Sequence, residues 1–399
     1  MPPAPTISST ALAARVEPKV ILHITHHWGG GTEQHVQELT EYLGDAAVHL
    51  VIHSRADGLV TLSAPGQPDV AFHPQDDFPQ IVERLRGLHV ARIHVHQLFT
   101  VPIDVRRLVE ELRVAFDFTV HDYHTLCPRV HFKTRENAYC GEPDEAGCTA
   151  CLEDWSRADE RDIVDYRTRY TWVYREAERI ICPSRDVAAR VERYRPEANL
   201  VVAPHPRPIL AYPPVAAPRL APSEPLRVAV LGWVTAFKGA SRVLGAARIV
   251  ADRGLPIHIR IIGTIDGVVP DALDVTGAYE TDALQLLLGD YRPHLIWYAA
   301  QAPETYSYIL TEGLEAGLPV LVPRLGAFPE RVSGRPWSWI VDWDLTPEQA
   351  VSVLVDIREL FLSGVAPEVP VHDVTCHAPT AGIAFYRTAY LDGEKRHLG

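Results

Sequence analysis

Short apolar runs alternate with helical patterns along nearly the whole chain of 399 residues. The run VILHIT at Val20–Thr25 predicts a buried strand, and three glycines at Gly29–Gly31 predict a turn. Residues Glu33–Leu43 predict a helix, because their apolar side chains recur at helical spacing. Strands that alternate with helices form βαβ units, so the pattern indicates an α/β fold with a parallel sheet.

The same order of strand and helix continues to about residue 200. The further strands expected there are Val48–His53, Ala91–His96, Ala115–His121 and Arg179–Cys182, and the further helices are Ile81–Leu88 and one that begins near Ser184. Eight prolines then fall within residues 203–225, which indicates a stiff, extended connection rather than part of a core.

A second strand–helix series follows this connection. Its expected elements are Leu226–Leu231, Lys238–Asp252, Ile257–Ile262, Val275, His294–Tyr298, Glu304–Ala316 and Val320–Val322. The chain thus predicts two doubly wound, Rossmann-like domains that face each other across a cleft. Open sheets of this kind bind ligands beyond the carboxyl ends of their strands.

The domain boundaries follow from these series. We expect a loose N-terminal arm at 1–18, a first domain at 19–205, a proline-rich linker at 206–225, a second domain at 226–370 and a C-terminal segment at 371–399. No sequence repeat of 20–50 residues accompanies the two series, so the duplication is architectural.

Composition narrows the partners. A hydrophobic fraction of 47% excludes disorder throughout, and a formal charge of −13 argues against a surface built to neutralise nucleic-acid phosphates. No apolar stretch is long enough to span a bilayer, and the first 18 residues lack the pattern of a signal peptide. We therefore expect a cytoplasmic protein with no nucleic-acid partner, whose contact with a membrane, if any, is peripheral.

Lysine is scarce, since only Lys19, Lys133, Lys238 and Lys395 stand against 34 arginines. Lys238 follows the strand at Leu226–Leu231 in the loop GWVTAFKG, which begins at Gly232 and leads into a helix. A cation near a helix N-terminus is unfavourable unless an anion binds there, so Lys238 is a candidate for diphosphate oxygens. A solvated lysine at the helix start is the alternative.

Glycine and glutamate mark two further candidate positions. Gly30 and Gly31 allow a phosphate or sugar to approach the backbone at a helix N-terminus, although a plain tight turn is equally compatible. Glu304 and Glu312 lie eight residues apart in the expected helix Glu304–Ala316, too far apart to share one proton. They suit the two ends of an elongated ligand, while for Glu304 helix capping alone is the alternative.

Polar residues gather where the strand Ala115–His121 ends, in the run VHDYHTLCP. His121, Asp122 and Tyr123 belong to it, and His96 ends the neighbouring strand in sequence. Such density at a strand's carboxyl end favours a binding site over a core.

Four of the six cysteines crowd together, at Cys127, Cys140, Cys148 and Cys151. The last two form a C-x2-C pair of the kind found in zinc sites, but a second such pair is missing. A structural zinc site and unligated thiols or a local redox pair therefore both remain open. The segment Arg129–Cys151 reads as an insertion near the cleft.

Taken together, these residues resemble a retaining glycosyltransferase of family 4 with the GT-B fold. The resemblance runs from Ile21 to about Trp343 and rests on five segments, namely Gly29–His35, His121–Pro128, Arg179–Ser184, Leu226–Gly239 and Pro303–Arg331. The cysteine segment and SGRPWSW resemble a subgroup associated with bacterial O-antigen and capsule synthesis.

The resemblance implies roles for matching residues. Catalytic roles fall to His121, Glu304 and Lys238; donor binding to Gly30, Gly31, Gly232, Lys238, Ser307, Tyr308 and Glu312; and acceptor binding to His96, Asp122 and Tyr123. The donor would be a nucleotide diphosphate sugar, and the acceptor a glycan or lipid-linked glycan at the inner face of the bacterial plasma membrane. The segment 371–399 would pack back on the first domain. No catalytic metal or other cofactor is implied.

One departure stands out: Trp233 follows Gly232, where many relatives carry an arginine that binds phosphate. Arg242 is a candidate to replace that charge. A nucleotide-sugar epimerase with this fold, or an inactive nucleotide- or glycan-binding relative, is the alternative to a transferase.

Overall fold

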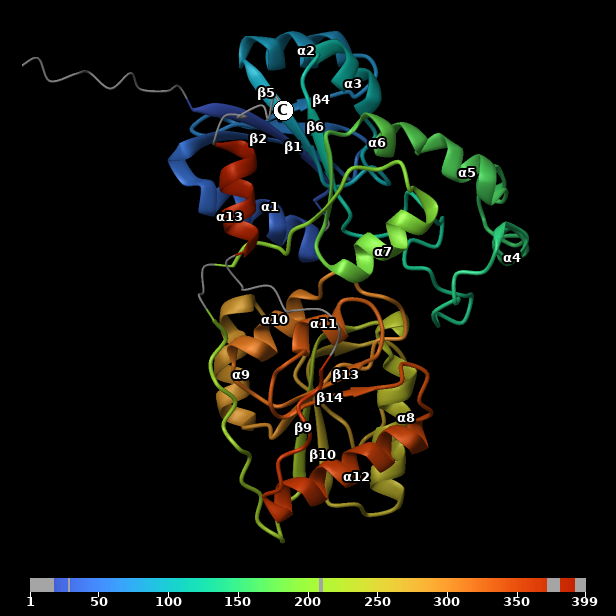
Figure 1. The fold of residues 1–399 in the computed structure, drawn as a ribbon, viewed down its shortest axis with the longest axis vertical. Coiled ribbons are helices and arrows are strands. Elements are labelled where there is room, and N and C mark those ends of the chain that lie inside the picture. Colours follow the sequence, from blue (N-terminus) through green and yellow to red (C-terminus); the bar gives the residue numbers. More distant parts are fainter. Residues whose placement is uncertain (1–17, 28, 208–210, 372–380, 392–399) are drawn as a thin grey trace, which may run out of the picture.

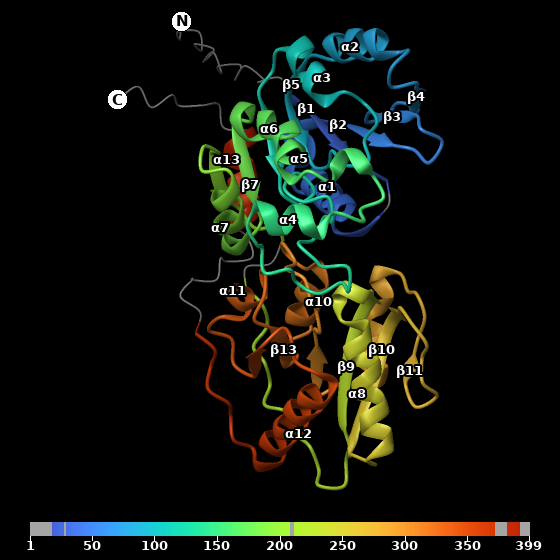
Figure 2. The same cartoon turned by 90° about the vertical axis from the view of Figure 1, so that its right-hand side faces the viewer.

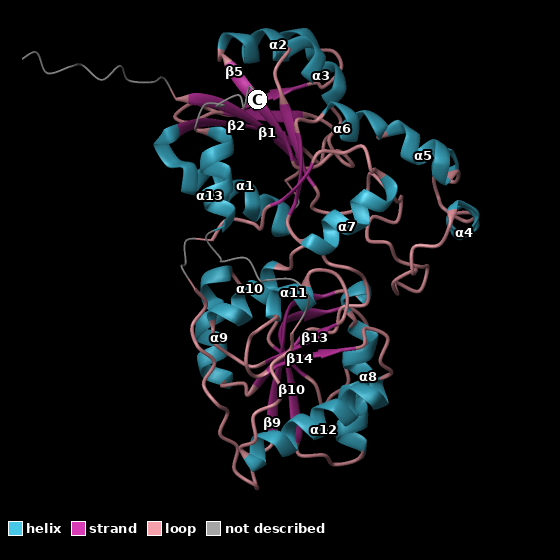
Figure 3. Ribbon diagram, in the orientation of Figure 1, coloured by secondary structure: helices cyan, strands magenta, loops and turns pink. Residues whose placement is uncertain are grey.

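The computed structural model describes residues 18–27, 29–207, 211–371 and 381–391. Within them, two α/β domains lie one above the other, as two perpendicular views show (Figures 1 and 2). Each domain is built on one mainly parallel sheet with helices around it (Figure 3). The predicted fold class of two doubly wound domains is confirmed. The expected arm at 1–18 falls outside the described residues except for Pro18, and Lys395 falls outside them as well.

The first domain contains a sheet in the order β4-β3-β2-β1-β5-β6-β7-β8. Its strands are β1 (Lys19–Thr25), β2 (Ala47–Ser54), β3 (Val60–Ser63), β4 (Val70–Phe72), β5 (Val90–Val95), β6 (Phe116–Thr119), β7 (Arg179–Cys182) and β8 (Leu200–Val202). The strands from β2 to β8 across the sheet pair in parallel, which is the arrangement that the sequence pattern predicts. Strands β3 and β4, which the pattern did not indicate, extend one edge as antiparallel strands.

Helices connect these strands. They are α1 (Gly30–Leu43), α2 (Phe78–Gly87), α3 (Val105–Leu112), α4 (Glu145–Cys151), α5 (Ile163–Arg169), α6 (Thr171–Glu176) and α7 (Arg185–Tyr194). Helix α7 begins where the sequence predicts, because the Ser184 side chain accepts a hydrogen bond from the backbone N–H of Val187 and so caps its N-terminus.

The second domain contains a sheet in the order β11-β10-β9-β12-β13-β14, in which all pairs are parallel. Its strands are β9 (Leu226–Val234), β10 (Ile257–Ile265), β11 (Asp274–Val275), β12 (Leu295–Trp297), β13 (Val320–Pro323) and β14 (Ser338–Val341). Its helices are α8 (Ala240–Asp252), α9 (Leu284–Tyr291), α10 (Tyr308–Glu315), α11 (Phe328–Val332) and α12 (Pro347–Ser363). The strand order changes direction between β9 and β12, and the cavity described below lies at that point.

The chain crosses between the domains twice. Residues 211–225 run without a helix or strand along the second domain, and the last described helix, α13 (Ala381–Tyr390), lies beside α1 of the first (Figure 1). Tyr386 and Tyr390 of α13 are buried in the first domain with Ile21 and Leu39. Gly382 lies so close to the Pro204 carbonyl that a Cβ atom there would sit 2.1 Å from its oxygen. Helix α13 therefore completes the first domain.

One predicted boundary is wrong. The helix expected to begin at Glu304 begins at Tyr308, because Ser307 has φ 71° and ψ 87°, a left-handed conformation that cannot continue a helix. Arg331 stabilises this turn by donating to the Tyr306 and Ser307 carbonyls at 2.8 Å each. Glu304 therefore lies on a loop, and the helix-capping interpretation of its charge does not hold.

Candidate active site between the two domains

A cavity in the second domain lies beyond the carboxyl ends of β9 and β12, on the side that faces the first domain. Its lining includes Lys238, Glu304, Ser307 and Ile309. Lys238 and Glu304 were predicted as site residues from two separate motifs, and the family resemblance implied donor binding for Ser307. The tertiary structure brings them to one place, at the carboxyl end of a parallel sheet, where ligands bind in open α/β folds.

Lys238 ends a short 3₁₀ turn, Ala236–Lys238, that leads into α8. Gly239 follows with φ 89°, and a Cβ atom there would lie 2.0 Å from the carbonyl oxygen of Ala299. Only glycine fits this close approach, which sets Lys238 against the loop after β12. The structure records no hydrogen bond or ion pair for its ammonium group among the described residues, which leaves that group available to an anion.

A second glycine positions Glu304. A Cβ atom on Gly326 would lie 2.6 Å from the Glu304 carbonyl oxygen and 2.7 Å from its nitrogen, so only glycine allows this packing. The backbone N–H of Ala327 donates to the same carbonyl at 2.9 Å. The Gly326–Ala327 pair of the sequence motif thus holds the backbone of Glu304 at the cavity.

The N-terminus of α10 opens on the same cavity. No side chain caps this helix, and Ser307 and Ile309 line the cavity. Unpaired N–H groups and the positive end of the helix dipole favour a negatively charged group at such a position. Lys238 and the α10 N-terminus therefore present positive charge to one volume.

The glycine turn of the first domain faces α10. A Cβ atom on Gly31 would lie 3.0 Å from a ring carbon of Tyr308, whereas Gly30, with φ 78°, has nothing within 4 Å of that position. Gly232 of the second domain lies instead against Ile309, where an added Cβ atom would be 3.0 Å from Cδ1 of that side chain. Of these expected donor-binding glycines, Gly30 leaves open space beside its backbone, and the other two allow close packing on α10.

Glu312 lies among charges from both domains rather than in the cavity lining. Its Oε1 lies 3.8 Å from Arg207 Nη2, and Arg207 also binds Glu38 of the first domain at 2.6 Å and Glu315 at 2.6 Å. Tyr308 donates a hydrogen bond to Glu38 at 3.2 Å. Burial, followed by Glu315, raises the pKa of Glu312. Three carboxylates thus share one guanidinium, an excess of negative charge that hydroxyl donors of a ligand would relieve.

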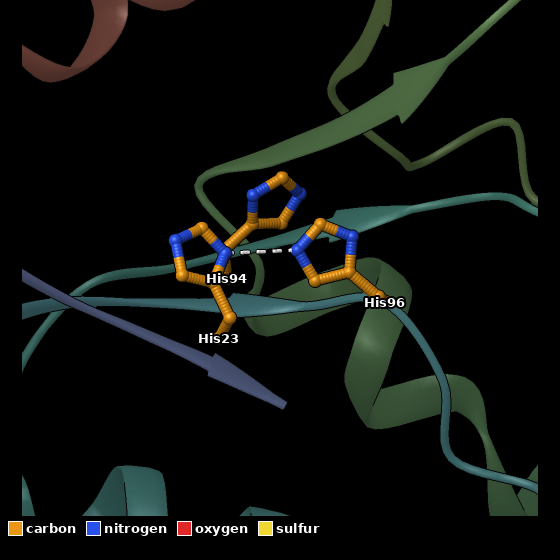
Figure 4. Close-up of side chains that lie close together, drawn as sticks. All are labelled: His23, His94 and His96. Carbon is orange, nitrogen blue, oxygen red and sulfur yellow. Dashed lines mark hydrogen bonds between the residues drawn. The ribbon is translucent and has the colours of Figure 1, made fainter. Parts of the chain in front are cut away.

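His121 and His96 belong to a cluster of seven histidines in the first domain. Its members are His23, His35, His49, His94, His96, His121 and His205, linked by hydrogen bonds or ring contacts. Figure 4 shows three of them, His23, His94 and His96, which project toward one another from β1 and the segment of β5. Each of these three has a hydrogen-bond partner on both ring nitrogens, so they form a continuous network. One nitrogen of each also lies within 4.8 Å of the others, a spacing at which a metal ion could be held.

The network determines which nitrogen of His121 carries the proton. A chain of hydrogen bonds links Nδ1 of His49 to Nε2 of His23 (2.9 Å), Nδ1 of His23 to Nε2 of His96 (3.0 Å), and Nδ1 of His96 to Nε2 of His121 (3.2 Å). The remaining nitrogen of His49, Nε2, is buried without a partner. A buried N–H without an acceptor is rarer than an unused lone pair, so each proton sits on Nδ1. His121 therefore accepts at Nε2 and keeps an N–H at Nδ1 for a ligand.

Burial keeps these rings neutral. It lowers the pKa of His121 to about 3, although Asp122 raises it, and it lowers the pKa of His49 to about 4. The pKa of His96 is well below its ordinary value for the same reason, with a further lowering by His94. His121 is thus a neutral hydrogen-bond donor at physiological pH.

The residues expected to bind the acceptor are mostly buried. His96 is 1% exposed and acts through His121, and Tyr123 is 0% exposed and stacks on Phe132 in the first-domain core, so neither can contact an acceptor in this structure. Asp122 uses both carboxylate oxygens, because it accepts from Gln97 at 2.8 Å and from the backbone of His124 at 2.9 Å. The alternation of a strand does not reveal whether the residues that follow it fold outward or back into the core.

Two interdomain contacts join motifs that lie far apart in the sequence. The Thr305 hydroxyl donates to the His121 carbonyl at 2.8 Å, which links the Glu304 loop to the polar run of the first domain. Glu330 accepts from the backbone N–H of Arg185, at 3.0 Å and 3.1 Å to its two oxygens. Burial raises the pKa of Glu330 to about 7.

The sequence analysis missed His131. Its ring stacks on Phe237 with the centroids 4.4 Å apart, and it interacts electrostatically with Asp122, Glu304 and Lys238. Burial lowers its pKa. The only sequence signal was its place in the cysteine-containing insertion, which was expected near the cleft.

Arg242, the expected replacement for the arginine that Trp233 displaces, is used elsewhere. It is buried and donates to the backbone carbonyls of Leu345, Ala299 and Trp343. Trp233 itself is 65% exposed and donates to Asp266 at 2.8 Å. Arg242 therefore holds the loop after β14 and leaves Lys238 as the cation at the cavity.

Residues 29–207 match the sequence model of Glycosyltransferase Family 4. No curated protein sequence matches the chain.

Solved structures show the same two-domain fold. A glycosyltransferase from Rickettsia africae superposes with a TM-score of 0.57 at 12% identity, covering 94% of each chain. HepE from Anabaena in complex with UDP and glucose gives 0.56 at 12% identity, covering 93% of this chain and 95% of its own. Sucrose-phosphate synthase from Thermosynechococcus elongatus gives 0.53 at 15% identity, covering 87% and 92%.

These likenesses establish the fold, and the family match covers the part of the chain that holds the glycine turn and the histidine cluster. The chain therefore has the GT-B fold of these solved structures, and its residues 29–207 are similar to Glycosyltransferase Family 4.

Proposed function

We propose that the protein is a retaining glycosyltransferase that moves a hexose or deoxyhexose from a nucleotide diphosphate sugar onto a growing glycan of a bacterial surface polysaccharide, O-antigen or capsule. The observation that carries the proposal is the cavity at which Lys238, Glu304 and the N-terminus of α10 meet. It offers two sources of positive charge and one carboxylate to a single ligand.

Donor binding follows from that charge. The Lys238 ammonium and the N–H groups near Ser307 and Tyr308 suit the oxygens of a diphosphate. Glu312, on the next turn of α10, would take the ribose hydroxyls, whose hydrogens relieve its crowded carboxylate. In support, the Anabaena relative of the same fold was crystallised with UDP and with UDP-glucose.

The transfer step is derived from the same groups. The bond between the sugar C1 and the diphosphate oxygen breaks, and the acceptor oxygen forms a new bond to C1 on the same face. The acceptor proton passes to the departing diphosphate oxygen, whose negative charge Lys238 and the α10 amides stabilise. His121 would donate its Nδ1–H to the transferred sugar, and Glu304 would accept from that sugar's hydroxyls. These roles need neither a paired general base nor a metal ion.

The acceptor is proposed from the resemblance of the cysteine segment and of SGRPWSW to enzymes of surface polysaccharide synthesis. In that setting the protein works in the cytoplasm, at the inner face of the plasma membrane, on a glycan or lipid-linked glycan. None of the helices in the described part of the chain combines the length and apolar character needed to cross a bilayer.

A panel of UDP-, GDP- and dTDP-sugars tests the proposal. Incubation with candidate acceptors, read by nucleotide release and product mass, is expected to give transfer from one donor class, and NMR of the product is expected to show the anomeric configuration of the donor. Failure of every donor to bind by calorimetry would refute the proposal. Isomerised nucleotide sugar formed without an acceptor would indicate an epimerase instead. Binding without turnover would indicate an inactive relative.

A further inference from the structure

The cysteine-containing insertion of the first domain encloses a cavity of its own. Cys127, Cys140, Cys148 and Cys151 all line it, and all four are free thiols. The fifth free cysteine in the described residues, Cys182, is buried on β7 and does not line this cavity. The four thiols come from three separate stretches of chain and meet at one cavity. Such an arrangement is unusual in an α/β domain and indicates a ligand site.

The four cysteines reach the cavity from three stretches of chain. Cys127 ends the turn after β6, where its N–H donates to the Tyr123 carbonyl at 2.9 Å. Cys140 lies on the far side of a loop, where its N–H donates to the Phe132 carbonyl at 2.9 Å. Cys148 and Cys151 lie three residues apart on α4, and thus on one face of that helix.

Two of the sulfur atoms already accept hydrogen bonds. The backbone N–H of Glu142 points at the Cys140 sulfur at 3.4 Å, after a turn in which Gly141 has φ 71°. The Arg167 guanidinium points at the Cys148 sulfur at 3.6 Å. A neutral thiol is a weak acceptor, whereas a thiolate bound to a metal ion needs such donors from the surrounding chain.

The cavity also carries compensating positive charge. Lys133 and Arg167 line it together with the four cysteines. A divalent cation with four thiolates has a net charge of −2, which two cations next to the site would balance. Glu142 lines the cavity as well, but its carboxylate already binds Arg190 and Arg193.

We propose that Cys127, Cys140, Cys148 and Cys151 bind one structural zinc ion. On binding, the four S–H groups lose their protons to solvent and form four Zn–S bonds, with no change of oxidation state. The ion would be four-coordinate and closed, without a free position for catalysis. In the structure no three of the sulfur atoms lie within 4.8 Å of one another, so the side chains must rotate about χ1 to close the site.

The ion would brace a loop that touches the second domain next to Lys238. The Tyr139 N–H donates to the Gln301 carbonyl at 2.6 Å, and His131 stacks on Phe237, the residue before Lys238. Val130 and Phe132, on either side of His131, both have left-handed backbone conformations, with φ 65° and 49°. Such conformations are costly for a β-branched or bulky residue and persist only where the surroundings impose them, which a zinc ion at the base of the loop would do.

Metal analysis of the full-length protein tests the proposal, with zinc as the probe. The protein is expressed with added zinc, purified without chelators and analysed by inductively coupled plasma mass spectrometry. We expect about one zinc per chain, lost in the Cys148→Ser/Cys151→Ser double variant and kept in Cys182→Ala. Absence of zinc, iron in its place, or zinc retained by the double variant would each overturn the proposal.

A measurement on the wild-type protein covers the case in which the double variant does not fold. Stepwise modification of the thiols with a mercurial reagent is expected to release the zinc, detected with a chelating dye. Zinc that stays bound after all thiols have reacted would show that another site holds it. The metal count does not depend on sugar transfer, so it can fail or succeed separately from the proposed function.

Discussion

Each of the two domains is built on its own mainly parallel sheet, but the domains differ in the side chains that they bury. The second domain has an apolar core and places Lys238 and Glu304 at a cavity beyond the carboxyl ends of its strands. The first domain places a cluster of seven histidines inside, and two tyrosines of α13 donate to it or accept from it. Among the described histidines the second domain contributes only His258 and His294.

This difference indicates a division of labour. In the proposed function the second domain supplies charge to a ligand through partly exposed groups such as Lys238 and Glu304. The first domain supplies a neutral and rigid hydrogen-bond donor, His121, whose protonation state is set by the hydrogen-bonded histidines behind it. A histidine in water would titrate near neutral pH, and burial among other histidines removes that titration.

The largest expected effect is a difference between the domains in acid. The pKa of each clustered histidine is lowered in the folded state. Its contribution to the free energy of unfolding is therefore present above the unfolded pKa near 6.5 and is lost as the pH falls below that value. Near pH 5.5 the seven histidines together would lower the free energy of unfolding of the first domain by on the order of 5–10 kcal/mol. That loss is comparable with the whole stability of a domain.

Hydrogen exchange measured by mass spectrometry at a series of pH values resolves this effect. Protection in β1 and β5 is expected to fall between pH 6.5 and 5, before protection in β9 and β10. The second domain is the internal control, since it has two partly buried histidines instead of seven. If protection were lost in both domains at the same pH, the first domain would not be more sensitive to acid than the second.

The second largest effect is expected from removing the positive charge of Lys238 in the second domain. Lys238→Ala is expected to lower kcat by about 100-fold or more, because the departing diphosphate loses a charge that no other described side chain at the cavity supplies. Steady-state kinetics with the identified donor measure it. Lys19→Ala, an exposed lysine on β1, is the matched control and should leave kcat unchanged. Equal rates for Lys238→Ala and the wild type would exclude the role.

A smaller effect is expected from changing Glu330, which joins the domains through its contact with the backbone N–H of Arg185. Burial raises the pKa of Glu330 to about 7, so its ionisation in the folded protein opposes stability as the pH rises from about 4.5 to 7 and above. Glu330→Gln keeps an acceptor for the Arg185 N–H without the charge. It should raise the melting temperature by a few degrees at pH 8 and leave it unchanged near pH 4.5. A lower melting temperature at pH 8 would show that the charge itself stabilises the contact.

The smallest expected effect is that of a chelator. EDTA added to the transfer assay should leave the rate unchanged, because Lys238 and the α10 amides take the place of a metal ion at the diphosphate. Zinc content is measured alongside, so that loss of the structural ion is not mistaken for loss of a catalytic one. Inhibition that Mg²⁺ or Mn²⁺ reverses would overturn the metal-free mechanism.

Much of the fold was accessible from local patterns. Strands such as β1 and β9 contain apolar runs, so strand order along the chain and the two-domain division could be read directly. The glycine turn expected at Gly232 was wrong, because β9 continues through Gly232 to Val234 and pairs there with β10. The pattern failed where a single residue overrides periodicity. The left-handed backbone of Ser307 makes the expected helix begin four residues late, at Tyr308 instead of Glu304. The β3–β4 hairpin carries too few residues to stand out.

The site was accessible only in part. Lys238 and Glu304 were predicted as site residues from rarity and spacing, and the structure places both at one cavity. Tyr123 and His96 looked equally suitable and are buried. His131, Glu38 and Arg207 were missed, since their importance depends on partners far away in the sequence, such as Glu38 and Arg207, which bind each other across 169 positions.

By itself the sequence determined most of the secondary structure, the division into two sheets and the residue types at most strand ends, because these depend on spacing over a few residues. Only the tertiary structure decided which of those residues meet. Whether a histidine is a neutral donor, a carboxylate shares a guanidinium, or four thiols surround one cavity depends on burial and on contacts between distant segments. No local pattern encodes those contacts.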